Sequence, residues 1–180
     1  MKQEPIDLLV TNASEVLALS GPARPRAGEE MSHLGIVATG AVAVRKGKIL
    51  EVGPSAKLSR KYRAKKKISA KGRVVSPGLV DPHTHLTFAA MRENEFEMRL
   101  RGTPYMEIAR AGGGILSSAD HVRKASRKQI VDFSRGWARR MLAHGTTTVE
   151  AKSGYGLTVR DELKQLRAVR DLDQKEAIDF

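Results

Sequence analysis

The sequence predicts an α/β protein in which a small β-rich module, residues 1–73, precedes the first β/α units of a parallel sheet, residues 74–180. In the first part, short apolar runs are separated by turn residues, which is typical of strands. In the second part, strand-like runs alternate with helical periodicity, the order that builds a parallel sheet with crossover helices. The length of 180 residues is sufficient for a domain with a real core.

The β-rich module begins with two apolar runs, 8–10 and 16–19, which the turn residues 11–14 separate. Residues 40–53 form two further β-rich runs on either side of Lys46 and Gly47. This pattern predicts a hairpin in which Gly47 supplies the positive φ that the turn needs.

The net charge of +12 is concentrated between Lys57 and Arg73, a stretch without any acidic residue. Such a stretch is either a nucleic-acid patch or a solvated, partly disordered connection. No aromatic platform accompanies it, because Tyr62 stands alone. The sequence therefore disfavours nucleic-acid binding.

The histidines His83 and His85 carry the strongest chemical signal. They follow the apolar residues Leu79 and Val80, and Pro82 indicates that the strand ends here. Side chains two residues apart in a strand project to the same side, so both imidazoles could bind one metal ion. Two unrelated histidines are the alternative interpretation of this pair alone.

The remaining segments predict alternating helices and strands. Residues 87–100 read as a loop with a short helix, and Thr103 with Pro104 marks the start of a helix over 105–110 that the glycines 112–114 end. Ser126 with Gln129 forms a capping box for a helix that extends to His144. A strand over 146–151 and a loop over 152–157 follow. Thr158 then caps a second helix, and residues 177–180 could open a third strand. The expected inward face of this second helix comprises Leu163, Leu166, Val169 and Leu172.

Several segments together resemble the amidohydrolase superfamily, and within it the imidazolonepropionase family. They are Pro-Gly-Leu-Val-Asp-Pro-His-Thr-His-Leu at 77–86, Arg-Glu-Asn-Glu-Phe-Glu at 92–97, the stretch from Tyr105 to Ile115, and the stretch from Ala143 to Leu157. The resemblance implies the amino-terminal part of a metal-dependent (β/α)₈ barrel, preceded by part of a β-sandwich. It covers nearly the whole chain.

The implied reaction is the hydrolysis of the cyclic amide 4-imidazolone-5-propanoate to N-formimidoyl-L-glutamate, a step of histidine degradation. The resemblance implies that His83 and His85 bind one zinc or iron ion. It also implies that Arg92, Tyr155 and, more weakly, Tyr105 contact the small-molecule substrate. A guanidinium can grip the propionate with two parallel hydrogen bonds, but Arg92 could also be a surface ion-pair partner.

A complete barrel needs about 250 residues, more than the 180 residues of this chain. Family members complete the metal site with a third histidine and an aspartate from later strands. We therefore expect a truncated family member that is catalytically weak or dead alone. Two alternatives remain: another cyclic amidohydrolase or deaminase of the superfamily, and a non-catalytic basic fragment that binds nucleic acid.

The chain has no cysteine, so any metal must rest on His, Asp and Glu. We find neither a signal peptide nor an apolar run of about 18 residues, and expect a soluble, cytoplasmic protein. The resemblance leaves a homodimer of the full-length form open.

Overall fold

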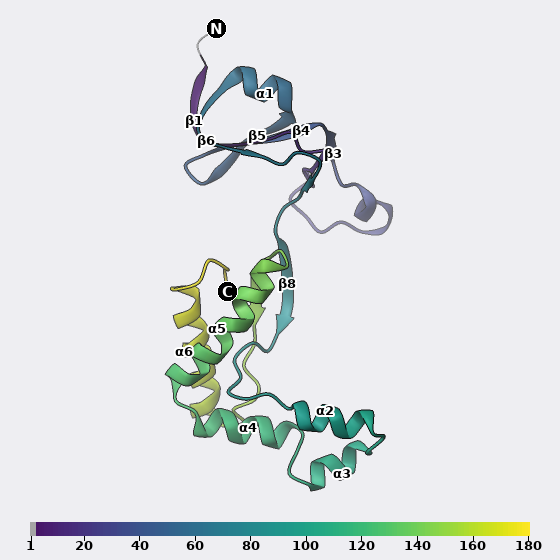
Figure 1. The fold of residues 1–180 in the computed structure, drawn as a ribbon, viewed down its shortest axis with the longest axis vertical. Coiled ribbons are helices and arrows are strands. Elements are labelled where there is room, and N and C mark those ends of the chain that lie inside the picture. Colours follow the sequence, from purple (N-terminus) through teal and green to yellow (C-terminus); the bar gives the residue numbers. More distant parts are fainter. Residues whose placement is uncertain (1–2) are drawn as a thin grey trace. The chain divides into compact units, whose positions relative to one another are not determined.

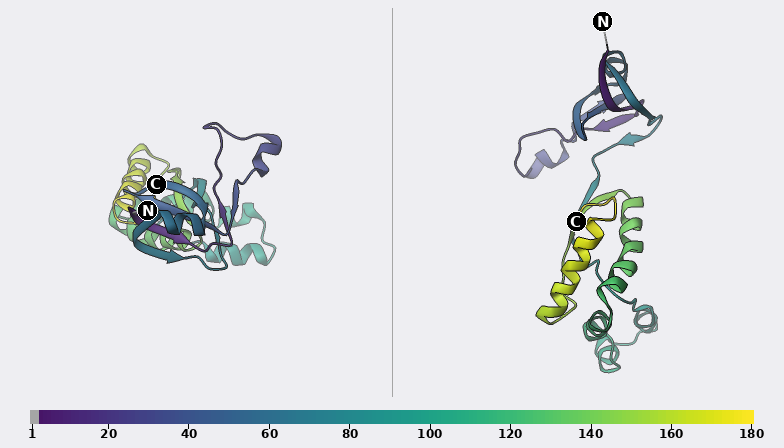
Figure 2. Two further views of the ribbon diagram at one scale, coloured as in Figure 1. Left: turned by 90° about the horizontal axis from the view of Figure 1, so that it is seen from above. Right: turned by 90° about the vertical axis from the view of Figure 1, so that its left-hand side faces the viewer.

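The computed structural model describes residues 3–180 and divides the chain into two compact units, Met1–Pro77 and Gly78–Phe180. Figures 1 and 2 show the ribbon of each unit: the first consists mainly of β-strands, and the second mainly of helices. The predicted α/β class is confirmed. Val74 and Val75, which the sequence analysis assigned to the second domain, form β7 (Val74–Val75) and pair with β2 of unit 1.

Unit 1 contains two sheets. The first has four strands in the order β5-β4-β1-β6, and the second has three in the order β3-β2-β7. Their remaining bounds are β1 Glu4–Thr11, β2 Glu15–Leu17, β3 Ile36–Ala38, β4 Gly40–Arg45, β5 Lys48–Pro54 and β6 Tyr62–Ser69, with a 3₁₀ helix at Gly28–Ser32. The predicted β4–β5 hairpin is confirmed, and both Lys46 and Gly47 have positive φ at its turn.

The central strand β4 of the four-stranded sheet is buried on both faces, whereas the edge strands β5 and β6 are largely exposed. Ala41 and Ala43 belong to a core that Leu58 of α1 (Ser55–Lys61) completes, whereas Val42 belongs to a second core with Val16 of β2. Alternate residues of a strand point to opposite faces, so α1 covers one face and the three-stranded sheet covers the other.

The basic stretch is ordered in the structure. It forms α1 and β6, and β6 pairs in parallel with β1. Of the two interpretations of this stretch, the partly disordered connection is therefore not what the structure shows. Part of its charge is neutralised locally, because Lys57 and Lys61 form ion pairs with Glu51, and Lys65 with Asp7.

Unit 2 contains the predicted parallel strands β8 (Leu79–Thr84) and β9 (Thr146–Ala151). The crossover between them includes α2 (Glu93–Leu100), α3 (Tyr105–Arg110), α4 (Ile115–Lys124) and α5 (Arg127–Ala143). Residue Asp179 pairs with Thr148, so the expected third strand begins beside β9. The described residues thus form the start of a parallel β/α sheet and no closed barrel.

Local signals place the two long helices correctly. Ser126 and Gln129 form the predicted capping box of α5, and Thr158 accepts a hydrogen bond from the Asp161 N–H at the start of α6 (Val159–Asp173). The predicted inward face of α6 is wrong in part, because Leu163 and Leu166 are 42% and 45% exposed. Gln165, Ala168 and Leu172 are buried instead. Two of these, Ala168 and Leu172, pack into the unit 2 core, which also contains Val122, Ile130 and Val149.

None of the helices between residues 3 and 180 combines the length and apolar character that a bilayer span requires.

Candidate metal and substrate site

The end of β8 presents the two predicted metal ligands on one side of the chain. His83 is the penultimate residue of the strand and is exposed, whereas His85 follows the strand and is half-buried. Their ring centroids lie 5.4 Å apart at an interplanar angle of 66°. The Asp81 carboxylate accepts a hydrogen bond of 3.2 Å from the backbone N–H of His83. The spacing of two residues therefore brings the imidazoles together, as predicted from the strand period.

The imidazole of His85 has an unsatisfied nitrogen. Its Nδ1 atom is buried and has no hydrogen-bond partner within residues 3–180. A buried polar atom without a partner costs free energy, and a metal ion or a further polar group would relieve that cost. The donor set thus fits a metal, although the described residues bring together no cluster of three or more His, Cys, Asp or Glu side chains suited to holding one.

Tyr155 reaches this pair from a distant part of the sequence. It lies in the loop of residues 152–157 between β9 and α6, which we call the Tyr155 loop. Its ring centroid is 5.0 Å from that of His85, nearly perpendicular at 86°, and 4.7 Å from that of Phe88. Of the three predicted substrate contacts, Tyr155 alone has a ring contact with a predicted metal ligand among the described residues.

The Tyr155 loop approaches His85 closely enough to require a glycine. Gly154 has a φ of +137°, and a Cβ atom at this position would lie 3.1 Å from the His85 Cε1 atom and 3.5 Å from Nδ1. An L side chain would be strained by this φ and would press on the imidazole. Gly154 therefore lets the loop backbone lie directly against His85.

Two side chains of α6 that the sequence analysis did not select hold this loop. The Glu162 carboxylate accepts hydrogen bonds from the N–H groups of Gly156 and Leu157, and the Gln165 carbonyl oxygen accepts one from the Tyr155 N–H. Burial of Glu162 opposes its ionisation, but the Ser153 hydroxyl and the backbone N–H groups outweigh this, so the pKa of Glu162 is lowered. No sequence signal marked this contact, because the apolar residues of α6 predicted a different inward face and the burial of Gln165 is seen only in the structure.

Arg92 lies immediately before α2, at its N-cap position, and its side chain is exposed. Its Nη1 atom is 3.6 Å from the Glu95 Oε2 atom, and that same oxygen accepts a hydrogen bond of 3.0 Å from the Gly114 N–H. Arg92 and Glu95 line a cavity of about 260 Å³ together with Ser117 and His121. His121 carries no motif, and nothing in the sequence pattern singled it out.

Tyr105, the weaker candidate, is the first residue of α3 and is 61% exposed. Its hydroxyl group lies beside Gly114, where a Cβ atom would come within 3.1 Å of it. None of the contacts within the described residues joins Tyr105 to the histidine pair.

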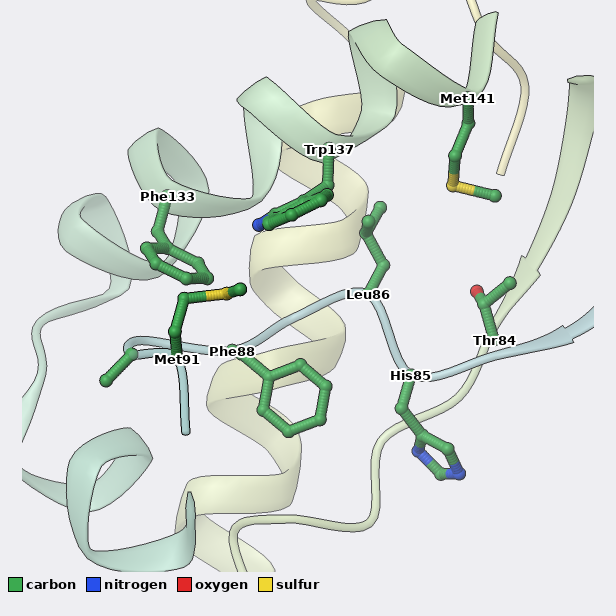
Figure 3. Close-up of a pocket in the computed structure, with 9 residues that line it drawn as sticks. Thr84, His85, Leu86, Phe88, Met91, Phe133, Trp137 and Met141 are labelled. Atoms are coloured by element: carbon green, nitrogen blue, oxygen red, sulfur yellow. The ribbon is translucent and has the colours of Figure 1, made fainter. Parts of the chain in front are cut away.

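A second, apolar cavity of about 380 Å³ lies between the end of β8 and α5. Figure 3 shows Phe133, Trp137 and Met141 of α5 on one side of it, with Leu86 extending toward them. In the same view the imidazole of His85 points away from Trp137 and Leu86. His85 therefore borders this cavity while its polar edge faces the Tyr155 loop.

Comparison with known proteins gives one family match, the amidohydrolase family, over residues 74–171. An imidazolonepropionase of Symbiobacterium thermophilum is 45% identical over 174 residues, which cover 95% of this chain and 40% of the relative. An imidazolonepropionase of Chloroflexus aggregans is 44% identical over 177 residues, covering 98% of this chain and 42% of the relative. The chain thus spans about 40% of the length of the curated relatives that it matches.

Solved structures show the same type of fold at low sequence identity. Guanine deaminase of E. coli matches with a TM-score of 0.59 at 14% identity, over 92% of this chain and 33% of that chain. Atrazine chlorohydrolase of Arthrobacter aurescens, solved in complex with zinc, matches with a TM-score of 0.50 at 16% identity, again over 92% and 33%.

Proposed function

The chain belongs to the amidohydrolase family, and on this premise we propose that it supplies part of the metal and substrate site of an imidazolonepropionase. Such an enzyme hydrolyses the cyclic amide of 4-imidazolone-5-propanoate to N-formimidoyl-L-glutamate. The observation that carries the proposal is the contact between the rings of Tyr155 and His85 at the end of β8. It joins a predicted substrate contact to a predicted metal ligand across 70 residues of sequence. The identity of 45% to a curated imidazolonepropionase supports the same activity.

His83 and His85 would hold one metal ion, zinc or iron, since imidazole nitrogen suits both. When bound, the metal would lower the pKa of a water molecule toward about 7 and polarise the ring carbonyl of the substrate. Two histidines provide half of the four ligands that zinc usually takes, so the other ligands would belong to the part of the relatives that this chain does not span.

Arg92 would bind the propionate group. Its distance of 3.6 Å from Glu95 is too long for a hydrogen bond, and among residues 3–180 its side chain donates none. Its guanidinium donors therefore remain available for a carboxylate, which it can grip in a bidentate manner. Glu95 holds the guanidinium near the cavity by charge.

Tyr155 would lie against the substrate ring while packing on His85, and Phe88 beneath it would exclude water from that side. Tyr105 is the third proposed contact, and it rests on its motif alone. We assign no role to the apolar cavity beside α5.

The test is a chimera in which residues 1–180 replace the matching region of the Symbiobacterium thermophilum relative. We expect this chimera to open the imidazolone ring, and we expect His85→Gln to abolish turnover together with metal content. A folded, metal-loaded chimera without activity would overturn the proposal. We expect the 180-residue chain alone to show little or no turnover, because it brings only two ligands, and a normal rate would contradict that expectation.

Arg92→Met in the chimera tests the substrate class. Loss of a charge-assisted bidentate pair should raise KM by roughly tenfold to a hundredfold and leave metal content unchanged. Arg99→Met is the matched control, because Arg99 is an exposed arginine near the end of α2, the helix that Arg92 precedes, and this variant should leave KM unchanged. If both variants behave alike, the substrate is a cyclic amide or amidine without the propionate.

A further inference from the structure

The carboxylate of Glu162 lies inside the Tyr155 loop. Its Oε1 atom accepts hydrogen bonds of 2.8 Å from the Gly156 N–H and 2.7 Å from the Leu157 N–H. Its Oε2 atom is buried and has no hydrogen-bond partner within residues 3–180, so Oε1 alone makes the hydrogen bonds to the loop backbone. The loop backbone is packed so tightly on α6 that a Cβ atom at Gly156 would lie 2.6 Å from the backbone of Asp161 and of Glu162. The loop therefore wraps around one fixed negative charge, as loops with successive inward N–H groups do around anions.

Two further side chains, Gln165 and Arg123, also hold the Tyr155 loop in place. Gln165 accepts a hydrogen bond from the Tyr155 N–H and donates one to the Thr87 carbonyl, two residues beyond His85. Arg123 of α4 donates a hydrogen bond of 2.8 Å to the Gly156 carbonyl. The segment that carries His85 and the loop that carries Tyr155 are thus both tied to the first turns of α6.

The first half of the same loop meets His85. Gly154 lies against the imidazole, and the Tyr155 ring stands nearly perpendicular to it at 5.0 Å. A displacement of the loop would therefore change the surroundings of His85 directly. The chain of contacts runs from Glu162 through the loop backbone to the imidazole.

We propose that Glu162 is a positioning residue, whose carboxylate holds the Tyr155 loop against His85 and so fixes both the imidazole and the phenol. Its importance for a reaction rests on the function proposed above, but its effect on the loop does not. The competing explanation is that Glu162 only stabilises the N-terminal end of α6, where negative side chains are favourable. Thr158 already caps that end by accepting the Asp161 N–H.

The two explanations predict different spectra for the full 180-residue chain. We propose to measure, by NMR, the hydrogen exchange of the Gly156 and Leu157 amides and the ring proton resonance of His85, which the nearby Tyr155 ring shifts. In Glu162→Ala the exchange of both amides should accelerate by about tenfold or more, because two charge-assisted hydrogen bonds are lost. The His85 resonance should move toward the position of an exposed histidine.

Glu176→Gln is the matched control. Glu176 lies beyond the other end of α6 and binds Arg135 and Arg139 at 2.9 and 2.8 Å, and its side chain is 7% exposed. This variant should leave the loop amides and the His85 resonance unchanged. Glu162→Gln keeps the shape of the side chain, so it should fold even if Glu162→Ala does not, and it should change both signals in the same direction by a smaller amount.

The proposal is overturned if Glu162→Gln and Glu176→Gln give the same exchange rates of the loop amides and the same His85 resonance. Faster exchange of the loop amides with an unchanged His85 resonance would overturn it as well. In that case the Glu162 carboxylate would hold the loop without fixing the His85 imidazole. Failure of the proposed function would show differently: the folded, metal-loaded chimera would not open the imidazolone ring, while the effect of Glu162 on the loop of the 180-residue chain would remain.

Discussion

Gly154→Ala is the substitution that most directly tests the close packing of the Tyr155 loop on His85. The φ of +137° at Gly154 is one that side chains rarely adopt, and holding alanine there costs about 1–3 kcal/mol. In addition, the new methyl group would lie 3.1 Å from His85 Cε1, so the imidazole must shift by a few tenths of an ångström. We expect unit 2 to lose about 1–3 kcal/mol of unfolding free energy, and metal binding to weaken because His85 has moved.

The assay is urea denaturation followed by the fluorescence of Trp137, the single tryptophan, which packs against the core of unit 2. Gly136→Ala is the matched control. Gly136 lies within α5, and a Cβ atom there would meet nothing within 4 Å. Alanine should therefore stabilise the helix by roughly 0.5–1 kcal/mol. If both variants unfold at the same urea concentration as the wild type, or if both are stabilised, the described packing of Gly154 on His85 is incorrect.

Three further substitutions test the core, the capping box and the charge network. Leu172→Ala, at a fully buried position, should lower the free energy of unfolding of unit 2 by about 2–5 kcal/mol in the same urea assay. Ser126→Ala removes the oxygen that accepts the Gln129 N–H and should cost about 1 kcal/mol there; a cost near zero would refute the capping box. The pKa of Glu51 is lowered from 4.5 to about 2 by hydrogen bonds from Lys61, Tyr62 and Lys57. The ionised carboxylate therefore stabilises unit 1 above pH 4.5, and this stabilisation is lost as the pH falls toward 2. Thermal unfolding should therefore show that Glu51→Gln is less stable than the wild type at neutral pH, and that its stability changes less between pH 4.5 and 2. If the stability of both proteins depends on pH in the same way, the contacts of Glu51 with Lys57, Lys61 and Tyr62 do not contribute as described.

The sequence predicted those elements whose signals are local. The helix α5 follows from a capping box and apolar residues at helical spacing, and both signals lie within the helix and its caps. The strand β6 was missed because lysines and an arginine dominate it. As an edge of the four-stranded sheet it exposes these side chains, and charged residues on an edge strand discourage pairing with other chains.

The site could be predicted only in part, for a related reason. The spacing of His83 and His85 places both imidazoles together by strand geometry alone. The contact of Tyr155 with His85 depends on the pairing of β8 with β9, so no local pattern could show it, and only the motif resemblance selected Tyr155. The orientation of α6 was mispredicted because Gln165 is buried to hold the loop, whereas Leu163 and Leu166 are exposed.

The most direct measurement is a zinc titration of the 180-residue chain in which the ring resonances of its five histidines are followed by NMR. If His83 and His85 form two ligands of one metal site, their resonances should shift together with a common dissociation constant. The resonances of His33, His121 and His144 should respond weakly or not at all. Shifts of equal size at all five histidines, or a response that survives His85→Gln, would contradict a metal site at the end of β8.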